Sequence, residues 1–192
     1  MRKIIAALNM SLDGYCDHTI GLPDEEIHQH YTRLLGEGDA ILYGRTTYEL
    51  MEFWRTVLDN PSDEASMNDF ARAIDALPKI VFSRTLKKVD WKTARLADRD
   101  LADEVAALRQ ESGKPVFVGS RSLIVQLLNA GLVDELQLCI YPVAAGGGLP
   151  LFSSLTGALN FELTNTRAFT GGAVLLYYRP LKHPANRGGE QP

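Results

Sequence analysis

Ala40-Ile41-Leu42-Tyr43-Gly44-Arg45-Thr46-Thr47-Tyr48-Glu49 carries the strongest structural signal of the chain. The first four residues are apolar and predict a short buried strand, and Gly44 breaks the apolar run just before a helical segment. Such a junction gathers backbone N–H groups, the positive end of a helix dipole, two threonine hydroxyls and the Arg45 guanidinium, which together suit a phosphate. A glycine also serves local purposes at many turns, so this stretch alone leaves a phosphate site and an ordinary turn equally open.

Two further predicted strands end in similar chemistry. Lys79–Phe82 runs into Ser83-Arg84-Thr85, and Pro115–Val118 runs into Gly119-Ser120-Arg121-Ser122 before an apolar helix. Taken singly, each serine can simply cap a helix or turn and each arginine can be solvated. Ligands of open α/β sheets bind beyond the carboxyl ends of the strands, where three such ends would meet. Together they predict a site for an extended ligand that carries several phosphates.

The hydrophobic pattern predicts one α/β domain over residues 1–180. Helical and strand patterns alternate as far as Gly131, and three strands without intervening helices follow, the last two joined at Thr170-Gly171-Gly172. This order predicts a mostly parallel central sheet with an antiparallel C-terminal hairpin and helices on both faces. Residues 181–192 are polar and are predicted to be a disordered tail.

Local signals within the domain predict the individual elements. Asp24-Glu25-Glu26 is expected to open a helix, a second helix is expected from Thr46 to Trp54, and a third is expected to begin with Ser62 as its cap. A short strand is expected over Thr93–Leu96.

Composition limits the classes of function. The 192 residues are 45% hydrophobic and 23% charged, which is typical of a globular domain, and no apolar run approaches the ~20 residues of a membrane helix. The N-terminal apolar stretch is too short for a signal peptide, so we expect a cytoplasmic protein. A net charge of −4 argues against nucleic acid or an anionic membrane as the main partner. The two cysteines and four histidines show no metal-ligand spacing, so we expect no metal and no disulfide.

The order of these motifs resembles the dihydrofolate reductase superfamily over residues 2–180. Within it, the chain is most similar to the reductase domain of the bifunctional deaminase-reductase of riboflavin biosynthesis. The zinc signature of the deaminase half, H-x-E followed by P-C-x-x-C, does not occur in the chain. The resemblance rests on Asn9–Gly14, Leu42–Glu49, Phe82–Thr85, Val118–Ser120, Gly131–Leu136 and Pro142–Phe152.

The resemblance implies a three-layer fold and an NADPH site, and it implies that the family's cofactor-binding residues correspond to the following positions of this sequence. The segment that holds the adenosine 2′-phosphate matches Ser83, Arg84 and Thr85. In the loop after the Pro115–Val118 strand, Ser120 stands where many relatives have a second glycine. The pyrophosphate and adenosine-phosphate contacts match Gly44, Arg45, Thr46 and Thr47. The second phosphate loop matches Gly119, Ser120, Arg121, Ser122 and Leu123, and the nicotinamide ring and its covering loop match Ala7, Leu12, Asp13 and Gly14.

The substrate side is less defined. Glu26 is our candidate for the catalytic acid among three acidic residues at a predicted helix start, and partial burial would raise its pKa. The alternative is a solvated carboxylate that only complements the helix dipole. Further substrate-binding candidates are His30, Tyr31 and Cys139.

These observations predict an NADPH-dependent oxidoreductase similar to 5-amino-6-(5-phosphoribosylamino)uracil reductase, acting on a small heterocyclic or carbonyl/imine substrate. The alternatives are a dihydrofolate reductase acting on a pterin and a non-catalytic NADP-binding sensor or scaffold. We also expect a homodimer, because the apolar side chains Leu136, Leu138 and Ile140 alternate along a strand whose outer face needs cover. Relatives in the riboflavin branch commonly dimerise, which points the same way.

Overall fold

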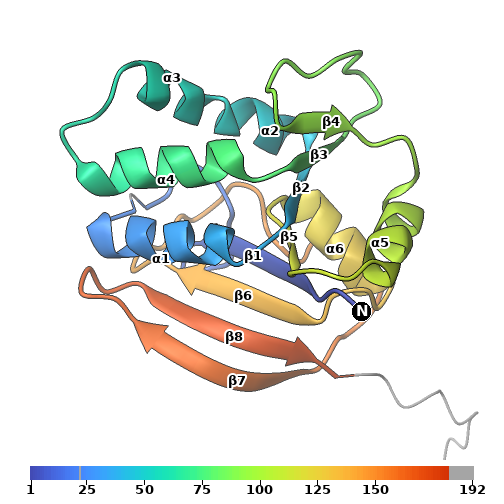
Figure 1. Cartoon of the computed structure of the whole chain (residues 1–192). Helices are drawn as coiled ribbons and strands as arrows, with labels where there is room; N and C mark the ends of the chain where they lie inside the picture. The colour runs from blue at the N-terminus through green and yellow to red at the C-terminus, as the bar shows by residue number, and fades with distance from the viewer. Residues whose placement is uncertain (22, 182–192) are drawn as a thin grey trace, which may run out of the picture.

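A single eight-stranded sheet forms the centre of the part of the chain that the computed structural model describes, residues 1–21 and 23–181. The strand order is β4-β3-β2-β5-β1-β6-β8-β7, parallel from β4 to β6 and antiparallel at β6-β8-β7. Figure 1 shows the β7-β8 hairpin at the lower edge of the sheet. The strands are β1 Ile4–Met10, β2 Ala40–Gly44, β3 Lys79–Phe82, β4 Ala94–Leu96, β5 Val116–Val118, β6 Glu135–Ile140, β7 Phe161–Ala168 and β8 Val174–Pro180.

Helices cover both faces of the sheet, which gives three layers. On one face α1 and α4 lie side by side, with α2 and α3 beyond them (Figure 1), and α5 and α6 cover the other face. The helices are α1 Glu25–Gly36, α2 Arg45–Met51, α3 Phe53–Asp59, α4 Ala65–Ala76, α5 Leu101–Gln110 and α6 Arg121–Asn129. The predicted fold class, an α/β sheet with an antiparallel C-terminal hairpin, is confirmed.

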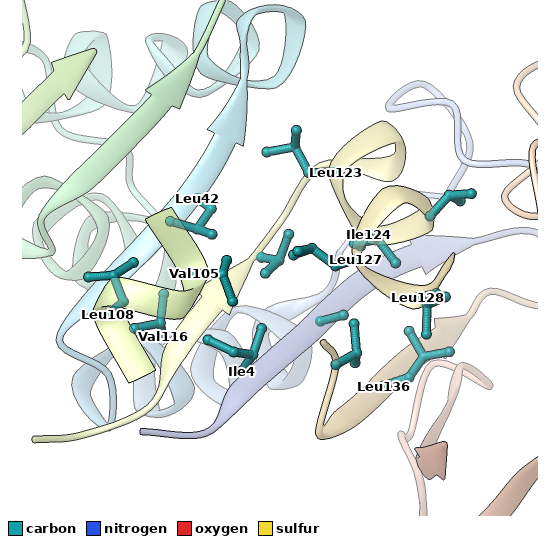
Figure 2. Close-up of a cluster of buried hydrophobic side chains, with 14 of the residues drawn as sticks. Ile4, Leu42, Val105, Leu108, Val116, Leu123, Ile124, Leu127, Leu128 and Leu136 are labelled. Atoms are coloured by element: carbon teal, nitrogen blue, oxygen red, sulfur yellow. The ribbon is translucent and has the colours of Figure 1, made fainter. Parts of the chain in front are cut away.

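The alternation of side chains along the parallel strands builds two separate cores. Ile4 and Ala6 of β1 are fully buried against α5 and α6, in the cluster that Figure 2 shows around Ile124 and Leu127. Ile5, between them, belongs to the core on the α1 and α4 face. Each buried leucine or isoleucine stabilises the fold by roughly 1.5–3 kcal/mol, so the two cores hold β1, β2 and β5 in a fixed register.

Two local predictions differ from the structure, and a third lies outside the described residues. The single helix expected over 46–54 is divided between α2 and α3, which are separated by Glu52. Ser62 does not cap α4, which begins three residues later, because its hydroxyl accepts the N–H of Glu64 instead. The expected tail, residues 182–192, lies outside the described residues.

The expectation that the apolar side chains of β6 lack cover is also wrong for Leu136 and Leu138. Leu136 and Leu138 are 1% and 4% exposed because α6 covers them. These side chains therefore give no ground for a partner. Within the described residues, none of the helices is both long and apolar enough to span a membrane.

Candidate functional site

The three polar strand ends meet at one edge of the sheet. β3, β2 and β5 are parallel neighbours, with Gly44 beside Phe82 and Leu42 beside Val118. Ser83 follows β3 and Gly119 follows β5, so both lie next to the end of β2. This arrangement is the one that the sequence predicted for the candidate cofactor edge.

A hydrogen bond joins two of these strand ends directly. The Gly44 N–H donates to Ser120 Oγ at 2.8 Å, which ties the end of β2 to the start of α6. The residue before α2 is Gly44, which has no side chain to cap the helix, and Ser120 before α6 makes no cap bond to its own helix. A side chain at Gly119 would put its Cβ 2.8 Å from the Tyr43 ring, which explains the glycine there. The first N–H groups of both helices therefore face this edge without a capping side chain.

The candidate cofactor arginines differ in their surroundings. Arg45 and Arg84 are exposed, and within residues 1–21 and 23–181 neither guanidinium group makes a hydrogen bond or ion pair. Arg121 donates to the Pro150 carbonyl at 3.0 Å. Ser83 Oγ accepts the N–H groups of Thr85 and Leu86, so this serine shapes the turn that presents Arg84.

The remaining cofactor candidates vary in exposure. Thr46 and Ser122 are exposed, and Thr47 is half-buried. Leu123 is 5% exposed, and its side chain points into the core of Figure 2, so only its backbone can reach a ligand at the edge. Ala7 is half-buried on β1, beside Gln137 of β6.

The loop after β1 is fastened to the glycine-rich loop after β6. Asp13 accepts hydrogen bonds from the Ser11 hydroxyl and from the N–H groups of Ala145 and Gly146, at 2.6, 2.9 and 2.7 Å. These bonds lower the pKa of the Asp13 carboxyl to about 2. Three backbone hydrogen bonds connect the same two loops: the Leu12 N–H donates to the Val143 carbonyl, the Cys16 N–H to the Leu149 carbonyl, and the Leu151 N–H to the Gly14 carbonyl. The Leu12 side chain is 65% exposed. Asp13, which the sequence matched to the loop that covers the nicotinamide, thus fastens its own loop to the loop after β6.

A network of neutral polar groups lies between α1 and the ends of β1 and β6. Tyr31 on α1 donates to Asn9 Oδ1 at 2.6 Å, and Asn9 Nδ2 donates to the Tyr141 hydroxyl at 3.3 Å. Burial raises the pKa of Cys139 to about 12 and raises the pKa values of both tyrosines, so all three stay protonated. Among the sequence candidates, the structure thus brings Tyr31 and Cys139 together.

Sequence reasoning missed Asn9 and Tyr141 as site residues. Asn9 occupies a strand position whose side chain shares a face with Ile5 and Ala7, so a polar residue in that alternation was the signal. Tyr141 follows β6 directly, and the loop residue Gly21 lies against its ring, where a Cβ would come within 2.5 Å of Tyr141 Cγ.

Glu26 does not have the raised pKa that the sequence suggested. Its carboxylate accepts the Thr170 N–H at 2.9 Å, the Arg167 guanidinium at 2.8 Å and the Thr170 hydroxyl at 3.0 Å. These partners, the Thr170 N–H most of all, lower the pKa of Glu26 to about 2. In this arrangement the group is an ionised acceptor that joins α1 to the β7-β8 turn.

His30 is placed differently from its neighbour Tyr31. Burial, together with the positive charges of Arg167 and Arg33, lowers the pKa of His30 to about 4, so the ring is neutral near pH 7. It lines a cleft of about 480 Å³ that also borders Pro115 and Glu135, toward the amino ends of β5 and β6. The cleft lies toward the opposite ends of the strands from the three polar strand ends, and the His30 ring also contacts the rings of Tyr31 and Phe169, with centroids 5.2 and 5.7 Å away.

Comparison with known proteins gives one family and several structural relatives. The sequence model of the RibD C-terminal domain matches residues 2–175. A curated relative, the uncharacterized protein YyaP of Bacillus subtilis, is 34% identical over 181 residues, which cover 92% of this chain and 94% of that protein.

Two solved structures share the fold. One is a diaminohydroxyphosphoribosylaminopyrimidine deaminase/5-amino-6-(5-phosphoribosylamino)uracil reductase of Thermotoga maritima, with a TM-score of 0.67, 15% identity and coverage of 94% of this chain and 57% of that one. The other is a dihydrofolate reductase of Enterococcus faecalis in complex with NADP(H), with a TM-score of 0.60, 13% identity and coverage of 94% and 97%. At these identities the likeness shows the fold alone.

Proposed function

The chain belongs to the RibD C-terminal domain family, a riboflavin-pathway type of reductase, and on that premise we propose that it is an NADPH-dependent reductase acting on a small heterocyclic or carbonyl/imine substrate. The observation that carries the proposal is the edge formed by the ends of β3, β2 and β5. Polar groups from three separate segments converge there, as an elongated cofactor requires.

The residues at this edge fit a dinucleotide with a 2′-phosphate. Arg45 and Arg84 are exposed cations without a partner in the described chain, so binding a phosphate breaks no existing ion pair. The starts of α2 and α6 have no side-chain cap, which leaves N–H groups for phosphate oxygens. Arg84, at the β3 end of the edge, would hold the 2′-phosphate, and the Gly44 and Gly119 segments would hold the pyrophosphate.

The chain's own tasks in the reaction are orientation and hydrogen bonding. When bound, NADPH supplies the hydride. Asn9, Tyr31 and Tyr141 would position the substrate's polar atoms beside the nicotinamide, and Asp13 would hold the covering loop closed over them. The Tyr141 hydroxyl accepts from Asn9, so its own proton is free to be donated to a carbonyl oxygen or ring nitrogen.

Cofactor titration tests the proposal without a known substrate. We expect the wild-type protein to bind NADPH more tightly than NADH by about 1.5–3 kcal/mol, roughly tenfold to a hundredfold, the range of hydrogen bonds to a charged group. Arg84→Ala should remove that preference and leave NADH affinity unchanged. Arg33→Ala, which removes another exposed arginine from α1, is the matched control.

Two results would contradict parts of this proposal. If neither dinucleotide binds to the wild type at millimolar concentration, the reductase assignment fails. If both bind equally well, Arg84 does not hold a 2′-phosphate. Oxidation of NADPH in the presence of a panel of pyrimidines, pterins, imines and carbonyl compounds then distinguishes a reductase from a cofactor-binding sensor and identifies the substrate class.

A further inference from the structure

A second polar cleft lies toward the opposite ends of the strands from the candidate cofactor edge. Its volume is about 480 Å³, and it borders Pro115, just before β5, and Glu135, the first residue of β6. None of its described lining residues belongs to the segments after β2, β3 and β5 that form the cofactor edge. We call it the amino-end cleft, and its charged and buried polar lining residues are His30, Arg33, Glu37, Glu135, Gln137 and Tyr177.

Two polar atoms are buried in this lining without a partner. Gln137 is 3% exposed, and its Nε2 donates to Glu135 Oε1 at 2.6 Å. An ionised carboxylate only accepts, so this contact fixes the orientation of the amide, and Gln137 Oε1 has no hydrogen bond within the described chain. His30 is 9% exposed, and its Nε2 is also without a partner there. Buried polar groups nearly always have a partner, so both atoms indicate that a ligand or water fills the cleft.

The charges around the cleft favour a cation. Glu135 and Glu37 supply two carboxylates, against one guanidinium from Arg33, which is exposed. Burial raises the pKa of the Tyr177 hydroxyl, Arg167 opposes this shift, and the charges of Glu135 and Glu37 add to it. Both carboxylates therefore lie close enough to the tyrosine to act together on a group bound beside it.

We propose that the amino-end cleft binds a small organic cation, a protonated primary amine with an apolar body. The N–H donors of the ammonium group would bind Gln137 Oε1 and the Glu135 carboxylate, while the body would lie against Leu34 and Phe117. Gln137 and Tyr177 are paired across β6 and β8, so the tyrosine stands beside the buried acceptor, and an aromatic ring attracts a cation over its face. The inference does not depend on the proposed function, because the two sites share no residue.

Three probes of similar shape and different charge test this site. Nuclear magnetic resonance titration of the isotope-labelled protein would use benzylamine, benzyl alcohol and benzoate. We expect benzylamine to bind at millimolar concentration and to shift the amide signals of Glu135, Gln137 and Tyr177. Benzyl alcohol and benzoate should bind about tenfold more weakly or not at all, because neither brings a charged donor to the buried acceptor.

Two variants change the proposed partners of the ammonium group. Gln137→Leu removes the buried acceptor at similar volume, and Glu135→Gln removes the charge but keeps an acceptor oxygen. Each should weaken benzylamine binding about tenfold. Asp103→Asn removes an exposed carboxylate from α5, on the other face of the sheet, and should leave the affinity unchanged. Thermal unfolding shows whether each variant folds, and the half-buried Glu135 provides the test if Gln137→Leu does not.

Several results would overturn the inference while leaving the reductase proposal intact. Equal affinities for benzylamine and benzyl alcohol would show that the cleft does not recognise charge. Benzoate binding as tight as that of benzylamine would mean that Arg33 dominates the site. If benzylamine does not bind at millimolar concentration, or shifts only signals elsewhere, the cleft holds water alone. Wild-type benzylamine affinity in folded Glu135→Gln would also contradict the assignment.

Discussion

At the scale of single residues, the Glu26 ion pair makes a testable link between charge and stability. The pKa of Glu26 in the folded protein is about 2, below its ordinary value of 4.5. A carboxyl group of this kind stabilises the fold fully above pH 4.5, and the contribution is lost as the pH falls from 4.5 to 2. We therefore expect Glu26→Gln to be less stable than wild type at pH 7, with the difference disappearing toward pH 2.

Urea unfolding at several pH values measures this difference. Arg167→Gln, which removes the other partner, should lower stability at pH 7 in the same way, and the double variant should show little further loss. A stability difference that does not change between pH 7 and pH 2 would contradict the ion pair. If Glu26→Gln instead lost about a hundredfold in turnover with normal NADPH binding, the acid role proposed from the sequence would be right.

The Glu26 case shows what the sequence could not reveal about a residue. Its acidic neighbours and its place in a helix were visible, but Arg167 lies 141 positions away. Which charges meet depends on how the β7-β8 turn reaches α1, and that is settled by packing. Tyr141 was missed for the same reason, because its partner Asn9 is 132 residues distant.

At the scale of elements, the parts set by local chemistry were predictable. Asp24 caps α1 by accepting the Ile27 N–H. Gly171 and Gly172, between β7 and β8, lie in the expected hairpin turn. The break between α2 and α3 was not predictable, because neither glycine nor proline occurs between Arg45 and Asp59 to signal it. The three strand ends could be placed together because parallel strands share a direction.

The contact between the two loops leads to a prediction at this scale. Asp13 is the acceptor for the N–H groups of Ala145 and Gly146, so Asp13→Ala should leave both without a partner. We expect these two amide hydrogens to exchange with solvent several times faster in the variant, as measured by nuclear magnetic resonance. Asp17→Ala is the control, because the Asp17 carboxylate accepts the N–H and the hydroxyl of Thr19 and lies beside His18, all within its own loop. Unchanged exchange at Ala145 and Gly146 in Asp13→Ala would show that the backbone bonds alone join the loops.

At the scale of the whole molecule, the two edges of the sheet differ. One edge is β4, a strand of three residues, and the other is β7, a strand of eight residues whose side chains are mostly exposed. Long exposed edges readily pair with another chain. β7 has Glu162 near one end and Arg167 near the other, so antiparallel pairing of two copies would bring opposite charges together. This edge replaces β6 as the physical ground for a homodimer.

We therefore propose that the protein dimerises through the β7-β8 hairpin, and Leu163 provides the test. Leu163 lies on β7 and is 50% exposed in the single chain. Pairing Glu162 with Arg167 sets Leu163 opposite Thr166 of the partner subunit, so a glutamate there would bury a carboxylate without a charged partner directly opposite it. In sedimentation velocity at micromolar concentration, wild type should be a dimer and Leu163→Glu a monomer. Phe53→Glu changes an equally exposed apolar residue on α3, away from the hairpin in Figure 1, and should remain dimeric. A monomeric wild type would end the proposal. Dimers of both variants would move the interface away from β7, since a buried unpaired charge at a dimer centre costs several kcal/mol.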